Sequence, residues 1–144
     1  MSAEQDKALV RRLVIEAQQN GNLHVVDEIL APDFVDHTPL PGVPPTRDGV
    51  KGLFAALKTA LPDLRIEILD QIAEGGGVAT RKRFTGTHGG PFLGVPASGR
   101  PVEFEVIDIL RSRDGRITDH WVVMDQLGLL TQLGAMPASQ AGVA

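Results

Sequence analysis

Residues 101–125 read PVEFEVIDILRSRDGRITDHWVVMD, and this stretch decides the fold. Two segments typical of strands, residues 101–111 and 116–125, flank the tripeptide Arg113-Asp114-Gly115. Asp-Gly between two such segments is a strong signal for a tight turn, because both residues tolerate the backbone conformations of a hairpin loop. The stretch therefore predicts two strands joined by a β-hairpin.

The length of the hairpin loop determines which side chains face one another. A three-residue loop with Gly115 as a bulge would place Asp108 opposite His120. A two-residue Asp114-Gly115 turn would instead place Asp108 opposite Trp121. Because a slip by one residue moves side chains to the other face of the sheet, the two registers predict different neighbours for Asp108. The sequence leaves both registers open.

Upstream of the hairpin, hydrophobic periodicity predicts two more strands and three helices. A Glu-Gly-Gly-Gly turn at 74–77 separates the two strands, and Thr46 is a good N-cap for the third helix. The predicted elements are helices at 4–19, 22–30 and 46–61, an extended segment at 33–38, strands at 64–73 and 78–87, and a last helical turn at 127–133. Helices followed by antiparallel strands indicate an α+β fold, with a ligand pocket between the sheet and the helices.

Composition limits the kind of protein. The chain has 144 residues, the size of one domain, and a net charge of −4 without a basic cluster other than residues 81–83. Two of those three side chains share a strand face, which favours a solvated sheet surface over a nucleic-acid site. The chain contains no cysteine and no apolar run long enough to span a membrane. Its N-terminus is polar, unlike a signal peptide. We therefore expect a cytoplasmic protein.

Several motifs together resemble the SnoaL-like polyketide cyclases. The resemblance covers residues 1–136 as a single domain and predicts a flexible tail at 137–144. The motifs, in chain order, are DFVDH at 33–37, GTH at 86–88, FLGVP at 92–96, GR at 99–100, DILR at 108–111, DGRI at 114–117, HW at 120–121, Asp125 and QLG at 132–134. Each motif is weak alone, but their order and spacing are specific to the family.

The resemblance implies a cone-shaped fold of the nuclear transport factor type, in which three N-terminal helices and a curved, mainly antiparallel mixed sheet enclose an apolar pocket. It also implies ring closure by intramolecular aldol condensation of a small hydrophobic carbonyl compound, with no metal or cofactor and with an aspartate as general acid/base. Homodimers are common in the family. Fold alone does not decide function, so a non-catalytic carrier, or another lyase, isomerase or epoxide hydrolase, stays an alternative.

Two residues are the predicted catalytic groups. Asp125 matches the position that resembles the catalytic aspartate of the family, and burial at the pocket rim would raise the pKa of its carboxyl. The same Asp125 also suits the N-cap of the helix that follows it. The resemblance implies that His37 faces the pocket, where its imidazole could assist near neutral pH. The alternative is a histidine that satisfies a buried backbone group beside the Pro-rich loop.

The remaining candidates are predicted to bind substrate. They comprise aromatic side chains of the pocket, polar residues of the hairpin and one loop histidine: Phe34, Phe54, Phe92, Trp121, Asp108, His120, Arg111 and His88. Phe92 lies in a Gly/Pro-rich loop and would cover the pocket mouth. Arg111 stands where the family has a histidine, so it would favour an anionic group if it pointed inward. The alternative, which the strand-end position favours, is a solvated arginine. The histidines show no close spacing typical of a metal site.

Overall fold

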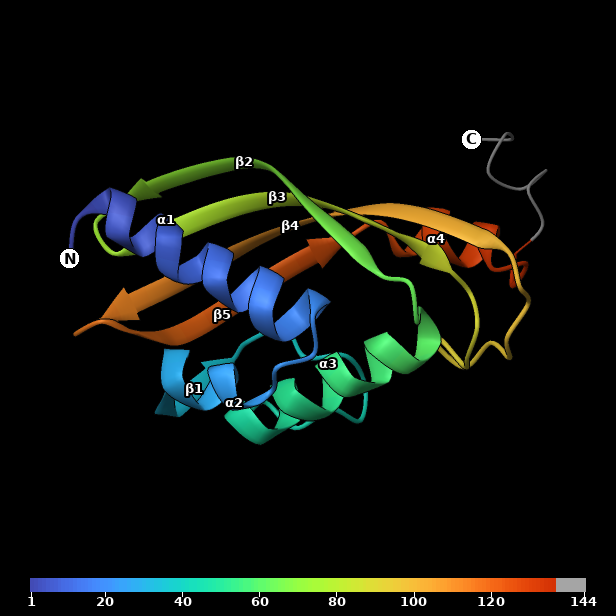
Figure 1. Ribbon diagram of the computed structural model, residues 1–144, viewed down its shortest axis with the longest axis horizontal. Helices are drawn as coiled ribbons and strands as arrows, with labels where there is room; N and C mark the ends of the chain where they lie inside the picture. The colour runs from blue at the N-terminus through green and yellow to red at the C-terminus, as the bar shows by residue number, and fades with distance from the viewer. Residues whose placement is uncertain (137–144) are drawn as a thin grey trace.

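The computed structural model describes residues 1–136 of the chain, so the tail predicted at 137–144 lies outside the described residues. Figure 1 shows a curved sheet with helices packed over one of its faces. The elements in order are α1 Ala3–Arg12, η1 Leu13–Gln19, α2 His24–Ile29, β1 Leu30–Asp36, α3 Arg47–Ala60, β2 Arg65–Glu74, β3 Gly77–Thr87, β4 Pro101–Arg113, β5 Arg116–Met124 and α4 Gln126–Gln132. The sheet has the strand order β1-β5-β4-β3-β2. No helix within these residues is long and apolar enough to cross a membrane.

The sheet is mixed, because β1 runs parallel to β5 whereas the other three pairings are antiparallel. The α+β class and the mainly antiparallel curved sheet are therefore confirmed. The first helix is continuous over α1 and η1, although its second half is π-helical. Figure 1 shows α1 lying across β2 and β3, while α3 packs near β1 and closes the opposite side.

Local capping explains where the helices start. The Ser2 hydroxyl accepts a hydrogen bond from the Gln5 backbone N–H, and the Gln5 side chain accepts one from the Ser2 N–H in return. Thr46 caps α3 by accepting from the Gly49 N–H at 3.2 Å, as predicted. Such caps satisfy N–H groups that have no partner inside the helix.

The hairpin register differs from both predicted registers. Arg113 pairs with Arg116, so Asp114 and Gly115 alone form the turn. Both residues have positive φ angles, 52° and 79°. Thr118 is then left without a cross-strand partner, since Ser112 pairs with Ile117 and Arg111 with Asp119. This bulge shifts the register by one residue, so that Asp108 faces neither His120 nor Trp121 but Val122.

The bulge places Asp108 and His120 on the same face of the sheet. His120 pairs with Leu110, which makes it the diagonal neighbour of Asp108 across the two strands. Alternate residues of β4, from Val102 to Leu110, are buried on this inner face. On the outer face, Arg81 and Arg83 form ion pairs with carboxylates of β2 and β4, as expected for a solvated sheet surface.

Candidate functional site

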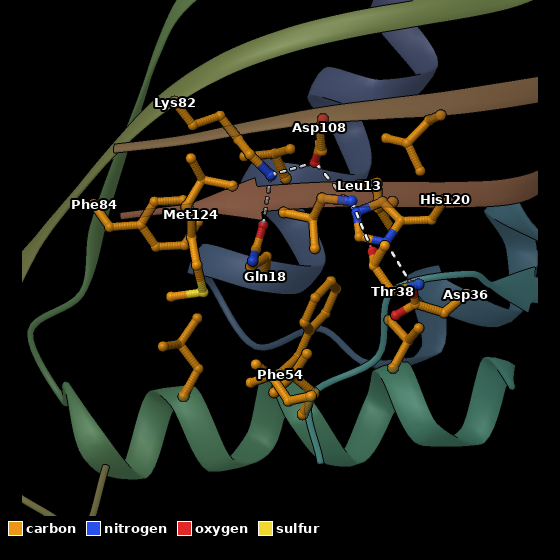
Figure 2. A pocket seen from close by; sticks show the side chains of 18 of the residues that line it. Leu13, Gln18, Asp36, Thr38, Phe54, Lys82, Phe84, Asp108, His120 and Met124 are labelled. Carbon is orange, nitrogen blue, oxygen red and sulfur yellow. Dashed lines mark hydrogen bonds and ion pairs between the residues drawn. The ribbon is translucent and has the colours of Figure 1, made fainter. Parts of the chain in front are cut away.

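A cavity of about 130 Å³ lies between the inner face of the sheet and the helices. Most of its wall is apolar, and Figure 2 shows α3 lying along one side and the sheet along the other. The predicted aromatic residues Phe34, Phe54 and Phe92 do line the cavity. The polar residues in the wall are Gln18, Asp36, Thr38, Lys82, Asp108 and His120. The apolar pocket expected from the sequence is therefore present.

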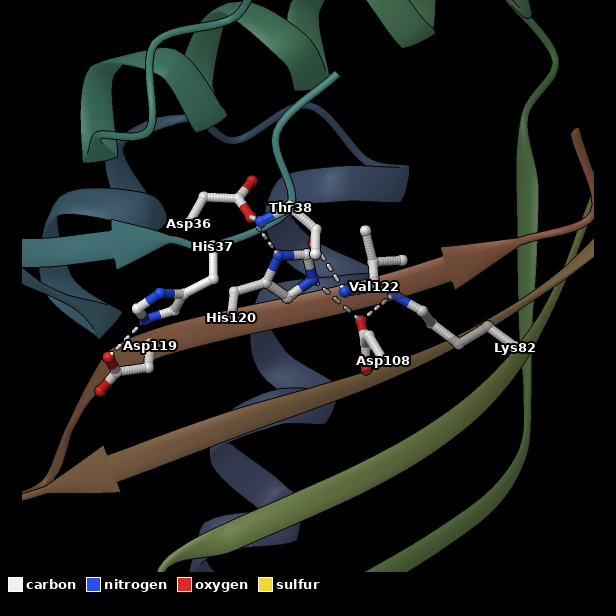
Figure 3. Close-up of polar contacts among 8 residues, drawn as sticks. All are labelled: Asp36, His37, Thr38, Lys82, Asp108, Asp119, His120 and Val122. Carbon is white, nitrogen blue, oxygen red and sulfur yellow. Dashed lines mark hydrogen bonds and ion pairs between the residues drawn. The ribbon is translucent and has the colours of Figure 1, made fainter. Parts of the chain in front are cut away.

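Four ionisable side chains form a chain of contacts along the sheet side of the cavity, as Figure 3 shows. The Lys82 ammonium lies 2.9 Å from Oδ2 of Asp108, and the same Oδ2 lies 3.5 Å from Nε2 of His120. The other ring nitrogen of His120, Nδ1, lies 3.1 Å from Oδ1 of Asp36. The imidazole thus stands between two carboxylates.

These contacts determine the protonation states. Burial acts to lower the pKa of His120, but hydrogen bonds and charges from Asp108 and Asp36 outweigh burial and raise it above the ordinary value. Burial acts to raise the pKa of Asp108, yet the Lys82 charge and His120 hold it below the ordinary value. Burial acts to raise the pKa of Asp36, but the hydrogen bonds from His120 and the Thr38 backbone N–H, with nearby histidine charge, together outweigh burial and lower it. These shifts favour an imidazolium between two carboxylates.

One proton in this network is less firmly held than the others. The 3.5 Å separation between Nε2 of His120 and Oδ2 of Asp108 is at the outer limit for a hydrogen bond. The Thr38 hydroxyl accepts from the Val122 backbone N–H at 2.8 Å, which leaves its own proton available to a ligand. The cavity can thus offer an imidazolium proton and a hydroxyl proton to carbonyl oxygens, beside a carboxylate.

Asp125 does not face the cavity, contrary to its predicted position at the pocket rim. Its carboxylate accepts a hydrogen bond from the Gly128 N–H at 2.9 Å and caps α4, so the N-cap interpretation is confirmed. The physical reason lies in the alternation of β5. Val122 and Met124 point into the cavity, so the chain leaves the strand before the next inward position.

His37 and Trp121 also lie outside the cavity wall, on the outer face of the sheet. Nε2 of His37 lies 2.9 Å from Oδ1 of Asp119, and the imidazole stacks on the Trp121 ring with a centroid separation of 4.4 Å. The expectation that both face the pocket fails because of strand alternation. Asp36 and Thr38 point inward on either side of His37, so His37 points outward. Val122, opposite Asp108, takes the inward position that one of the predicted registers gives to Trp121.

Two further predicted substrate ligands are placed elsewhere. Arg111 is exposed on the outer face, opposite Asp119, so it does not meet a ligand in the cavity. His88 is fully buried within the loop that follows β3. Its Nδ1 accepts a hydrogen bond from the Ser98 backbone N–H at 3.2 Å and lies 2.8 Å from the Ser98 hydroxyl. His88 therefore organises this loop, and it does not line the cavity.

Sequence reasoning missed four of the polar wall residues. The basic stretch 81–83 predicts a surface position for Lys82, Asp36 enters only as part of the DFVDH motif, and no pattern marks Gln18 or Thr38. A signal for Lys82 was present, because it shares strand parity with the inward residues Val78 and Phe84. A charged residue that interrupts the apolar face of a strand indicates a buried functional group.

The fold and the cavity define the class of protein: a cone-shaped α+β domain of the nuclear transport factor type, with acid and base groups at the wall of an apolar pocket. Within that class, the chain belongs to the SnoaL-like polyketide cyclase family, whose model matches residues 8–133. This finding confirms the predicted family and, with it, the predicted cyclase class of enzyme.

Individual relatives agree with this assignment. The aklanonic acid methyl ester cyclase of Streptomyces peucetius is 34% identical over 130 residues, which cover 88% of each chain. The structure of TsrD from Streptomyces laurentii superimposes with a TM-score of 0.86 at 32% identity, and the match covers 94% of this chain and 99% of that one. IdmH from Streptomyces antibioticus gives a TM-score of 0.78 at 37% identity, covering 90% and 99% of the two chains.

Proposed function

We propose that this protein closes a ring in a polyketide-like compound by intramolecular aldol addition, and that Asp108 and His120 carry the proton transfers. The observation that supports the proposal is the contact of the His120 imidazole with the Asp108 carboxylate, 3.5 Å apart in the wall of an apolar cavity. An acid and a base held side by side are what an aldol addition needs. Asp125 and His37 are replaced in this role because neither lines the cavity.

The proposed reaction balances without an added reagent. The Asp108 carboxylate removes a proton from a carbon next to a carbonyl, and the enolate carbon attacks a second carbonyl of the same molecule. One carbon–carbon bond forms, and the His120 imidazolium protonates the oxygen that was the second carbonyl. The proton on Asp108 then returns to Nε2 of His120 across the 3.5 Å between them. Product and substrate therefore have the same mass.

The geometry weakens one of the alternative functions. Epoxide hydrolysis on this fold would need a water molecule held between two carboxyl groups of the pocket. Here the His120 ring occupies the space between Asp36 and Asp108. A carrier of hydrophobic compounds would use the apolar wall but would have no need of the ionised residues.

The test is turnover of aklanonic acid methyl ester, the compound in the name of the Streptomyces peucetius relative, and of a panel of poly-β-ketone esters. Chromatography with mass detection follows the appearance of an isomer of unchanged mass. We expect wild type to cyclise at least one compound and His120→Gln to lower kcat about 100-fold or more, a typical loss for general acid catalysis. The matched control, His37→Gln, changes a histidine on the outer face and should keep full activity.

Two outcomes would count against the proposal. Equal turnover by wild type and His120→Gln would exclude His120 as the acid. Binding of the panel by both proteins, without turnover by either, would favour the carrier.

We also propose that the protein forms a homodimer through the outer face of the sheet. Ile72, Ile107 and Val123 are 72%, 52% and 77% exposed there, and Ile107 pairs directly with Val123 across β4 and β5. An apolar patch of this kind is a typical interaction surface. Sedimentation of wild type and of Val123→Glu tests the proposal, since a dimer that uses this face should dissociate in the variant. The expected cytoplasmic location stays a prediction.

A further inference from the structure

Among residues 1–136, Lys82 is the one lysine that lines the cavity. It comes from β3, where Arg81 and Arg83 on either side point to the outer face and pair with exposed carboxylates. Only 3% of Lys82 is exposed. Besides Asp108 at 2.9 Å, its ammonium meets the Gln18 side-chain oxygen at 3.5 Å and lies 5.5 Å from the centre of the Phe84 ring. Figure 2 shows the ammonium pointing across the cavity wall between η1 and the sheet.

The stability of the fold does not explain why Lys82 and Asp108 form a buried ion pair. Removing an ammonium and a carboxylate from water carries a large penalty, and an apolar pair of similar size often serves a fold equally well or better. The surrounding wall is already apolar, with Phe84, Phe104 and Val106 beside the pair. Retaining two charges at this place therefore points to a role in binding or chemistry.

The shared carboxylate indicates what that role is. When Asp108 takes a proton from the substrate, its charge disappears and a negative charge develops on the enolate oxygen. Lys82 loses its anionic partner at the same moment and can pair with the new oxyanion. An interaction that becomes available only as charge develops lowers the barrier instead of merely binding the ground state.

The ion pairs of Asp108 restrict the substrate further. Lys82 at 2.9 Å and His120 at 3.5 Å stabilise the ionised carboxylate, in agreement with its lowered pKa, so Asp108 is a weak base that removes only a relatively acidic proton. A carbon between two carbonyl groups carries such a proton. Its enolate spreads the charge over two oxygens, one of which can meet Lys82 while the Thr38 hydroxyl donates to the other.

We propose that Lys82 is the oxyanion-binding residue of the cavity, and that the substrate presents a β-dicarbonyl carbon whose enolate oxygen lies against the Lys82 ammonium. This inference deepens the proposed ring closure and rests on it for the order of steps. The binding of an oxyanion can nevertheless be measured without any turnover.

The probe for the test is 4-nitrophenol, a small aromatic phenol whose phenolate has a distinct visible absorbance. Asp108→Asn removes the competing carboxylate and keeps Lys82, whereas the double variant Lys82→Met/Asp108→Asn removes both charges. We expect Asp108→Asn to bind the phenolate at least tenfold more tightly than the double variant. The neutral phenol, tested at lower pH, should bind both variants with similar affinity. Lys58→Met/Asp108→Asn, which removes a lysine outside the cavity wall, should behave like Asp108→Asn.

Equal phenolate affinity of Asp108→Asn and the double variant would overturn the assignment of Lys82. If Asp108→Asn does not fold, the comparison is made between wild type, Lys82→Arg and Lys82→Gln by turnover of the poly-β-ketone esters. There we expect Arg to retain most of kcat, and Gln to lower kcat at least tenfold with little change in KM. Equal kcat for Arg and Gln would overturn the inference. Phenolate binding that depends on Lys82, without any ring closure, would support the oxyanion site while refuting the proposed reaction.

Discussion

The Lys82–Asp108 pair makes a quantitative prediction about stability. Each residue is only 3% exposed, so neither charge regains water when its partner is removed. Breaking a buried pair from one side typically costs about 3–5 kcal/mol, because a charge is left without compensation. In Lys82→Met the His120 imidazolium still lies 3.5 Å from Asp108, which places the expected loss near the lower limit, about 3 kcal/mol.

Removing both charges should cost far less. In Lys82→Met/Asp108→Leu no unpaired charge remains between them, so we expect the free energy of unfolding to lie within about 1 kcal/mol of wild type, or above it. Asp108→Leu leaves the Lys82 ammonium unpaired and should also cost about 3 kcal/mol, so the coupling energy between the two positions is about 5 kcal/mol. For a chain of this size, the loss in Lys82→Met corresponds to a fall in Tm of about 6–12 °C.

Urea unfolding of wild type, both single variants and the double variant completes the cycle. Arg81→Met is the matched control: Arg81 is the neighbouring residue, and it pairs with Asp70 and Glu105 on the exposed outer face. Water and salt screen those pairs, so its loss should be much smaller than that of Lys82→Met. The reasoning would be refuted if Lys82→Met were as stable as wild type, or if the double variant were less stable than either single variant.

Three further predictions concern other parts of the site. Because the pKa of His120 is raised in the folded state, protonation of His120 stabilises the fold below the ordinary histidine pKa, and this stabilisation is lost as the pH rises through the folded-state pKa. In urea unfolding between about pH 5 and 9, His120→Gln should therefore show a smaller change of stability with pH than wild type. Asp125→Ala should lower the free energy of unfolding by about 1 kcal/mol through loss of the α4 cap, and it should leave turnover unchanged. A lower kcat with unchanged substrate binding would instead show that Asp125 takes part in catalysis. Deletion of Thr118 should remove the bulge but keep Arg111 paired with Asp119 and Leu110 with His120. The tryptophan fluorescence and cyclisation should therefore stay as in wild type. A shift of the fluorescence to shorter wavelength together with loss of cyclisation would show that the unpaired residue is needed to hold His120 in the cavity.

Much of the fold is readable from the sequence because its signals are local. Hydrophobic periodicity marks helices and strands within a window of about 10 residues, and Asp114-Gly115 marks the hairpin. Both residues adopt positive φ in a two-residue turn, one of the two loop lengths that the sequence leaves open. Thr46 caps α3 as predicted, since a cap depends only on residues three positions apart. The aromatic wall of Phe34, Phe54 and Phe92 follows from the same patterns together with the family resemblance.

The catalytic face could not be predicted from local signals. Because Thr118 bulges out of the ladder without a partner, His120 and not Trp121 points into the cavity. No sequence pattern in the hairpin predicts this bulge. Asp36 joins the site only because β1 pairs in parallel with β5, far along the chain. By itself, the sequence determined the order of the elements, the α+β class and the apolar pocket, since periodicity and turn chemistry act over a few residues. The tertiary structure alone decided which charged side chains share that pocket, because strand register and side-chain parity depend on pairing between distant segments.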